Sequence, residues 1–195
     1  MTADSSAAPS RSQHLKASTT ATHDALDTRI MSEDIFASRA RFAKFLRVQY
    51  RFHRAIAPLY AAPSLAALIP DLDARPRLAQ IADDLGDLGE TLPAATAAVL
   101  PAPTSLPVAL GWLYVAEGSN LGGAVLYKLA ARLGLDAGCG ARHLAAHPDG
   151  AARHWRRFTA ALDAVVLTPA QEAQAVEGAN AAFRLVRGYV EEEFA

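Results

Sequence analysis

Residues 111–127 read Gly-Trp-Leu-Tyr-Val-Ala-Glu-Gly-Ser-Asn-Leu-Gly-Gly-Ala-Val-Leu-Tyr, an apolar helical pattern that contains Gly118, Gly122 and Gly123. Each glycine inside a helix costs roughly 0.5 to 1 kcal/mol relative to alanine, so the three together cost on the order of 2 to 3 kcal/mol. Alanine occupies 44 of the 195 positions, so a compositional accident is a poor explanation for three glycines in one helix. We therefore expect a specific reason for them.

Gly118 and Gly122 are four residues apart, so they share one face of the helix that the pattern predicts over about residues 106–132. Bare backbone on that face fits two explanations. The first is close packing of two helices through small residues, although that motif is best known from membranes and Glu117 argues against a membrane segment. The second is a ligand lying against a kinked, flexible helix, where Ser119 and Asn120 would hold water or donate hydrogen bonds.

A second feature is His23, in a helix expected from Ser12 to about Arg29. A lone histidine on a helix is usually a structural or surface residue. Asp27, four residues on, would accept its second ring N–H and leave the other ring nitrogen for a metal. One histidine is too few for structural zinc but suits haem iron with an open opposite side. Lys16 lies roughly 10 Å along the same face, within reach of a carboxylate on the ligand.

The rest of the chain is also expected to be helical, in a single domain. Helices are predicted over about 35–57, ended by Pro58, and over about 75–92, 151–166 and 169 onwards, with Thr168 as the N-cap of the last. A short helix is allowed at 94–99, inside a proline-rich loop. The 35–57 helix has a basic face, which is either solvated or a docking surface for an acidic partner; it consists of Lys44, Arg47, Arg51 and Arg54. The 75–92 helix has three aspartates that are expected to point outward: Asp83, Asp84 and Asp87.

Composition excludes several classes of function. The net charge of −1 argues against a nucleic-acid or anionic-membrane partner, and no apolar run is long enough to span a membrane. A lone cysteine, Cys139, excludes an intramolecular disulfide and fits the cytoplasm. Residues 1–12 are expected to be a disordered leader, and residues 13–195 the folded domain. A zinc site at His143, His147 and His154 is disfavoured, because glycines and Pro148 make their segment a loop without completing ligands.

Together these features resemble the bacterial, biliverdin-producing haem oxygenases. The resemblance is carried by residues 15–27 (Leu-Lys-Ala-Ser-Thr-Thr-Ala-Thr-His-Asp-Ala-Leu-Asp) and 114–123 (Tyr-Val-Ala-Glu-Gly-Ser-Asn-Leu-Gly-Gly), with a weaker echo at 179–183. It implies an all-α, single-domain bundle that holds haem b between the first helix and the kinked, glycine-rich distal helix. It makes His23 the axial ligand and implies two further sets of residues. The distal, catalytic set is Gly118, Ser119, Asn120, Gly122 and Gly123, and the haem-contacting set is Lys16, Thr19, Asp27, Tyr114, Arg153, Arg156 and Phe183, with Arg157 as a further candidate.

Two positions depart from the family pattern. Animal members place an aspartate where this chain has Ser119, and the position of Asp27 is often glutamate. The resemblance implies that haem is both cofactor and substrate and is cleaved with O2 to biliverdin, CO and iron. Electrons would come from a ferredoxin or flavodoxin reductase system, or from ascorbate in vitro, and a bilin-binding photoreceptor is a candidate downstream partner. Two alternatives stay open: a haem carrier that does not turn over, and a thiaminase-like all-α protein without haem.

Overall fold

The structure is a computed structural model that describes residues 9–94 and 98–195. Seven α-helices and three short 3-10 helices account for the regular structure of these ranges, and only isolated bridges at Asp136 stand in place of strands there. The elements are α1 (Arg11–Ser32), α2 (Arg39–Tyr60), α3 (Pro63–Ala66), η1 (Leu72–Ala74), α4 (Leu78–Asp87), α5 (Leu106–Ala130), η2 (Ala131–Leu133), η3 (Arg142–Leu144), α6 (Ala151–Ala164) and α7 (Pro169–Glu193). The prediction of an all-α domain is therefore confirmed.

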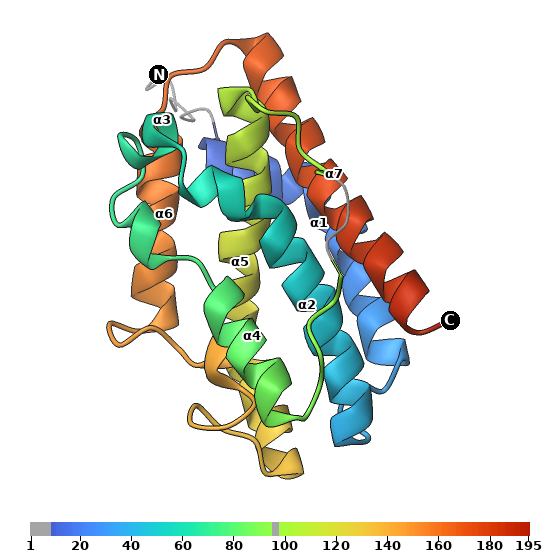
Figure 1. The fold of residues 1–195 in the computed structure, drawn as a ribbon. Helices are drawn as coiled ribbons and strands as arrows, with labels where there is room; N and C mark the ends of the chain where they lie inside the picture. The colour runs from blue at the N-terminus through green and yellow to red at the C-terminus, as the bar shows by residue number, and fades with distance from the viewer. Residues whose placement is uncertain (1–8, 95–97) are drawn as a thin grey trace, which may run out of the picture.

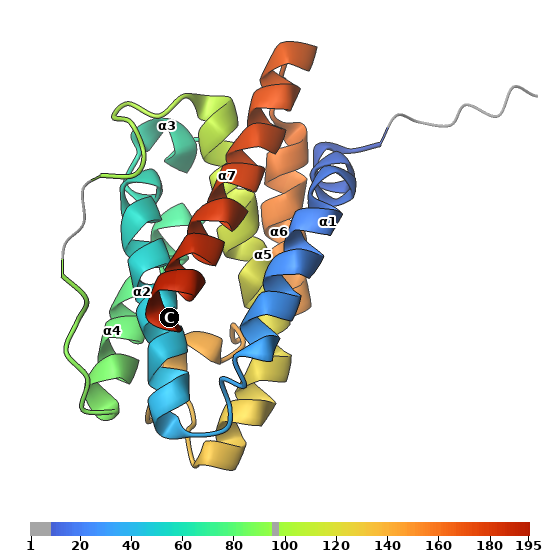
Figure 2. The same cartoon turned by 90° about the vertical axis from the view of Figure 1, so that its right-hand side faces the viewer.

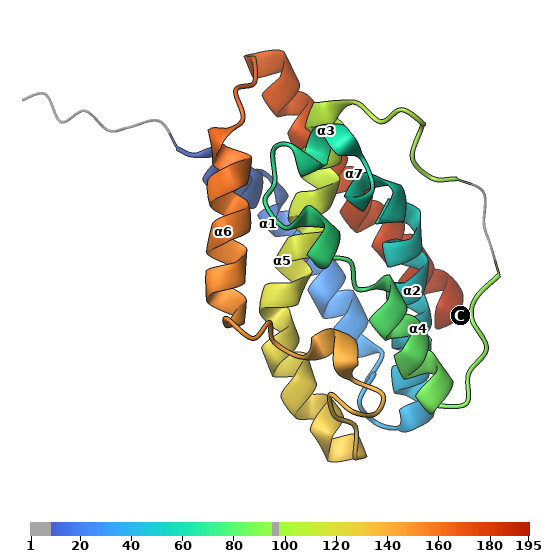
Figure 3. The same cartoon turned by 60° about the vertical axis from the view of Figure 1, so that its left-hand side comes forward.

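Helix α5 runs through the middle of the bundle (Figure 1). Helix α7 crosses α5 and also contacts α1 and α2, which lie on either side of it (Figure 2). Helix α4 lies along α2, and α6 packs on α5 and α1 (Figure 3). Helices α1 and α5 are thus placed mainly by their shared neighbours α6 and α7. Within the described ranges, no helix is long and apolar enough to cross a membrane.

Helix α1 begins earlier than the sequence predicts. Ser10 caps it, and the Gln13 side chain completes a reciprocal capping box. Arg11 is buried, pairs with Glu172 and donates to the carbonyl oxygens of Leu162 and Val165. Placing residues 10–12 in a disordered leader was therefore wrong, because these contacts dock them onto the α6–α7 connection. Residues 1–8 of the expected leader lie outside the described part of the chain.

Helix α2 differs from prediction in its end and in its charged face. It continues past Pro58 to Tyr60. Pro58 lies in the last turn, and burial of Leu59 and Tyr60 in the core outweighs the cost of the proline. Arg47 and Arg51 form ion pairs with glutamates at the end of α7, and Arg54 donates to the carbonyl oxygen of Pro93. Three arginines of the basic face therefore hold other parts of the same chain, so this face is not simply solvated.

Helix α4 is shorter than the predicted 75–92 helix. Arg75 belongs to the end of η1 as its C-cap, so α4 begins only at Leu78, and Gly89 follows its last turn with a left-handed φ of +74°. Asp84 is fully buried and accepts hydrogen bonds from η3, which corrects the expectation that it points outward. The allowed short helix at 94–99 includes residues 95–97, which lie outside the described part of the chain.

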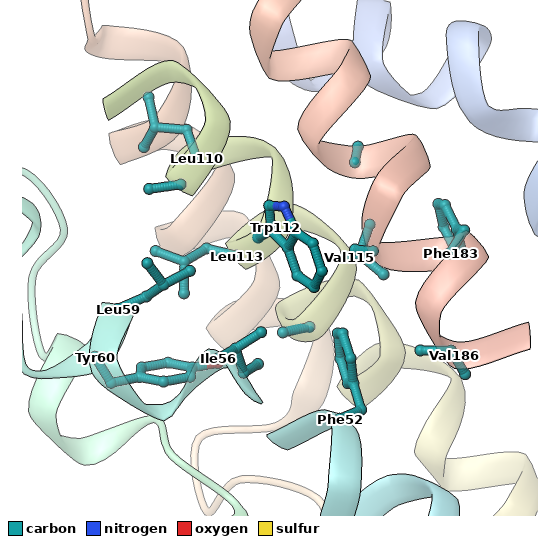
Figure 4. Close-up of a cluster of buried hydrophobic side chains, with 14 of the residues drawn as sticks. Phe52, Ile56, Leu59, Tyr60, Leu110, Trp112, Leu113, Val115, Phe183 and Val186 are labelled. Carbon is teal, nitrogen blue, oxygen red and sulfur yellow. The ribbon is translucent and has the colours of Figure 1, made fainter. Parts of the chain in front are cut away.

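Two helices pack closely at Gly111 and Gly178, where α5 crosses α7. A Cβ on Gly111 would overlap the carbonyl oxygen of Ala175, and one on Gly178 would lie 2.5 Å from that of Val108. Beside this crossing the core contains aromatic and aliphatic side chains of α2, α5 and α7, among them Trp112 (Figure 4). Close packing of two helices through small residues therefore does occur on α5, at Gly111, but it does not extend to Gly118 two turns further on.

Candidate functional site

His23 lies at the exposed edge of the buried face of α1. Leu15 and Thr19, two turns and one turn before it, are buried on that face, and the Thr19 hydroxyl donates to the Leu15 carbonyl oxygen. The His23 side chain is 60% exposed, and its ring meets that of Phe183 from α7 edge to face, with centroids 5.9 Å apart. Its Nδ1 lies 3.2 Å from the Asp24 carboxylate, so the prediction that Asp27 orients the ring was wrong in this structure. The adjacent residue reaches Nδ1 instead.

The predicted distal helix is a continuous α-helix through all three glycines. A Cβ on Gly122 would have no atom within 4 Å, and one on Gly118 would be 3.6 Å from the Trp155 ring, an ordinary contact. Gly123 is tighter, with the Leu144 carbonyl oxygen 3.4 Å from the Cβ position. Contacts within the described chain therefore do not require glycine at 118 or 122. Both positions therefore leave backbone open to the outside of α5.

Apolar side chains continue the face that these glycines share. Leu121 and Val125 follow at helical spacing and are 42% and 66% exposed. The result is an open strip on α5 that combines bare backbone with aliphatic side chains. Such a strip suits the flat apolar face of a large ring, because backbone without Cβ atoms permits close approach.

The remaining predicted site residues fall into two groups. Tyr114 is half-buried, which raises its pKa, and its ring packs on Trp155 beside Gly118. Asn120 is half-buried on α5, whereas Ser119 is exposed and its hydroxyl donates to the Ala116 carbonyl oxygen of its own helix. Four predicted contacts carry exposed charges on α1 and α6: Lys16, Asp27, Arg153 and Arg156.

Neither His23 nor any of the three glycines lines either of two cavities found among the described residues. One, of about 570 Å³, lies between α2 and the proline-rich segment that precedes α5. The other, of about 300 Å³, lies between α1 and α7 beside Phe183. The candidate site therefore rests on the open face of α5 and the exposed ring of His23, both of which are surfaces and not enclosed holes.

A buried polar cluster next to the glycines was missed by the sequence analysis. Glu117 accepts hydrogen bonds from the Tyr60 hydroxyl at 2.9 Å and from the Arg75 guanidinium at 2.8 Å. His154 Nε2 lies 3.1 Å from the same guanidinium. Burial raises the pKa of Glu117 against the opposing effect of Arg75, and burial with nearby positive charge lowers the pKa of His154 to about 4. The signal for this cluster was Glu117, the single charged residue in the apolar stretch 106–127.

A second polar group lies between α2, α4 and η3. His143 Nδ1 is 2.8 Å from the Asp84 carboxylate, which directs Nε2 away from it. Burial lowers the pKa of His53 to about 3, with smaller effects from His143 and Arg77. Three buried nitrogens have no hydrogen-bond partner among the described atoms: His53 Nδ1, His143 Nε2 and His154 Nδ1. Buried polar atoms of this kind normally bind ordered water.

Comparison with known proteins agrees with this geometry. A sequence model described as heme oxygenase matches residues 10–192, so the chain belongs to the heme oxygenase family. Membership makes it a haem-degrading oxygenase that uses haem as substrate and prosthetic group together with O2, which sets aside the haem carrier and the thiaminase-like alternative.

Among its relatives is heme oxygenase PigA of Pseudomonas aeruginosa, 43% identical over 185 residues that cover 95% of this chain and 93% of PigA. A crystal structure of the NO- and CO-bound heme oxygenase from Neisseria meningitidis superposes with a TM-score of 0.90 at 43% identity, covering 96% of this chain and 93% of that one. The heme oxygenase of Leptospira interrogans shares the fold at a TM-score of 0.74 and 17% identity, over 94% and 100% of the two chains.

Proposed function

We propose that His23 is the axial ligand of the haem iron and that Gly118, Gly122 and Gly123 line the opposite face of the haem. The observation that carries this assignment is the open space at Gly122. A methyl group at this position would touch no described atom of the chain, and yet the residue is glycine. Neutral imidazole is a suitable iron ligand, and Phe183 supports one edge of the ring.

Charged and hydroxyl groups of α1, α5 and α6 are proposed to bind the haem edge. Lys16, Arg153 and Arg156 are exposed cations suited to the propionates, with Tyr114 as a further contact. Arg157 is a weaker candidate because it already faces Asp71 at 3.4 Å and Asp149 at 3.6 Å. Thr19 and Asp27 complete the proposed set. Because Thr19 is buried, its proposed role is to pack beneath His23.

Bound haem supplies the iron that binds O2 and the ring that is oxidised. The chain contributes room, because glycines leave no side chain over that face, and a supply of ordered water. Ser119 fits the water role less well than predicted, since its hydroxyl is bonded to its own helix. Asn120 and the buried, unpartnered nitrogens of His53, His143 and His154 are proposed to hold water instead, without presenting a strong acid.

The family requires an external reductant. We propose a ferredoxin or flavodoxin reductase system for this role, with ascorbate as a substitute in vitro, and a bilin-binding photoreceptor as a user of the product. The cytoplasm is the proposed location, consistent with the lone Cys139, which is exposed and unpaired.

The His23→Ala variant tests the axial assignment. Because His23 is exposed and makes few contacts, the variant is expected to keep its helical circular dichroism and thermal midpoint. It is expected to lose the visible spectrum of histidine-ligated haem, and added imidazole is expected to restore part of it. The matched control is His14→Ala, an exposed histidine of the same helix. An unchanged haem spectrum in His23→Ala would show that another residue binds the iron.

A further inference from the structure

The helical segment 118–123 has few contacts of its own. Apart from the Trp155 ring beside Gly118, no atom of the described chain occupies the Cβ positions of Gly118 or Gly122. Ser119 and Leu121 are exposed. A segment with so little packing is held in place mainly by the residues at its two ends. We call residues 118–123 the glycine segment.

Glu117 holds the N-terminal end of the glycine segment. Its carboxylate is 1% exposed and accepts hydrogen bonds from Tyr60 of α2 and from Arg75, which precedes α4. Arg75 is itself 1% exposed, is 3.0 Å from the Asp71 carboxylate and lies 3.1 Å from His154 of α6. One carboxylate therefore connects α5 to three other parts of the bundle, one residue before Gly118.

Asp84 holds the C-terminal end through η3. It is fully buried and accepts the backbone N–H groups of Arg142 and His143 at 2.9 and 3.0 Å, and it also binds the His143 ring at 2.8 Å. These bonds fix η3, whose last residue, Leu144, places its carbonyl oxygen against Gly123. The contact between Leu144 and Gly123 thus depends on Asp84, a carboxylate of a different helix.

Stability alone is a poor reason for these arrangements. Taking a carboxylate and a guanidinium out of water costs about as much as their attraction returns, and apolar replacements of the same shape are often as stable. Charge-assisted hydrogen bonds do, however, fix direction and distance more strictly than apolar contacts. We propose that Glu117 and Asp84 are positioning residues that hold the glycine segment from both ends, and so set its distance from the haem. The haem-facing role of the segment rests on the function proposed above; the anchoring does not.

The test is amide hydrogen exchange, measured by mass spectrometry on the protein without haem. Glu117→Gln and Asp84→Asn keep size and shape but replace an ionised acceptor by a neutral amide. Each is expected to raise the exchange rate of amides in the glycine segment by roughly 10- to 150-fold, since a charge-assisted bond is worth on the order of 1.5 to 3 kcal/mol. Glu172→Gln is the matched control, because Glu172 pairs with buried Arg11 far along the chain from this segment. The control is expected to speed exchange near α1 and α7 only.

A second measurement uses the ferric haem complex. Azide binds iron on the face opposite the axial ligand, so its dissociation constant reports on the room and polarity beside the glycine segment. We expect a change of several-fold in Glu117→Gln and Asp84→Asn and none in Glu172→Gln. Unchanged exchange in residues 118–123, or a rise no larger than in the control, overturns the proposal even if thermal stability falls.

If Glu117→Gln fails to fold, Tyr60→Phe removes one hydrogen bond to the carboxylate and keeps the ring. Faster exchange confined to the glycine segment then supports the proposal, and wild-type exchange refutes it. The exchange experiment contains no haem, so its result is independent of the result for His23→Ala. Failure of the axial assignment and failure of the anchoring are therefore distinguishable.

Discussion

Replacing Gly122 by alanine separates what the chain needs for folding from what it needs for haem. Gly122 lies in the interior of α5, and its Cβ position has no atom within 4 Å. Without haem, Gly122→Ala is therefore expected to stabilise the protein by about 0.5 to 1 kcal/mol through helix propensity. For a domain of this length, a change of that size raises the thermal midpoint by roughly 1 to 4 °C.

With haem, the same methyl group is expected to be harmful. It stands on the face shared with Gly118, where the ligand is proposed to approach the backbone. Forcing one methyl into a close contact costs about 1 to 3 kcal/mol, which corresponds to a roughly 5- to 150-fold weaker interaction. A Soret titration for the haem dissociation constant and the rate of biliverdin formation with ascorbate both measure this loss.

The matched control is Gly86→Ala in α4, where the Cβ position is also empty. It is expected to change the thermal midpoint in the same direction and to leave haem binding and turnover unchanged. A Gly122→Ala protein that is more stable and also binds and degrades haem like the wild type would refute the close-approach argument. A lower thermal midpoint without haem would show instead that the position is not open.

Two further outcomes follow from the packing and from the buried histidines. Gly111→Ala is expected to destabilise the protein by about 1 to 3 kcal/mol, because its methyl would overlap the backbone of α7, which cannot rotate away. Urea unfolding measures this, and a midpoint equal to the wild type would contradict the tight crossing. Burial lowers the pKa of His53 to about 3 from an ordinary 6.5, so between these values the unfolded chain binds a proton that the folded chain does not. The free energy of unfolding is therefore fully maintained above about pH 6.5 and falls by about 1.4 kcal/mol per pH unit for this histidine as the pH drops towards 3. His53→Gln is expected to make that decline shallower in urea titrations at several pH values, and identical slopes would refute the shift.

The helices were predictable because their signals are local. Thr168, Pro169 and Gln171 mark the start of α7, and the structure shows the capping box that they imply. Gly134 ends the segment after α5 with a left-handed φ of +70°. These signals involve residues no more than four apart, so they survive whatever the rest of the chain does. Pro58 misled the prediction because burial of the two residues after it outweighs the local cost of a proline.

The partners of side chains were not predictable in the same way. Arg47 and Glu193 both look like solvent-facing charges in the sequence, yet they pair with each other across 146 positions. Asp84 sits on the polar side of an amphipathic pattern and is buried all the same, because η3 covers it. Periodicity states which face of a helix is polar, but it carries no information about which other element covers that face.

The sequence by itself determined that the chain is all-α, that three glycines in one apolar helix need a reason beyond helix formation, and that His23 lies on the first helix. Only the tertiary structure decided which glycines serve which purpose. Gly111 permits the crossing of α5 and α7, whereas a Cβ on Gly122 would meet no atom of the described residues within 4 Å. The cost of a glycine in a helix depends on backbone entropy and is local, but its benefit depends on what approaches the missing side chain, and that is set by the placement of distant helices.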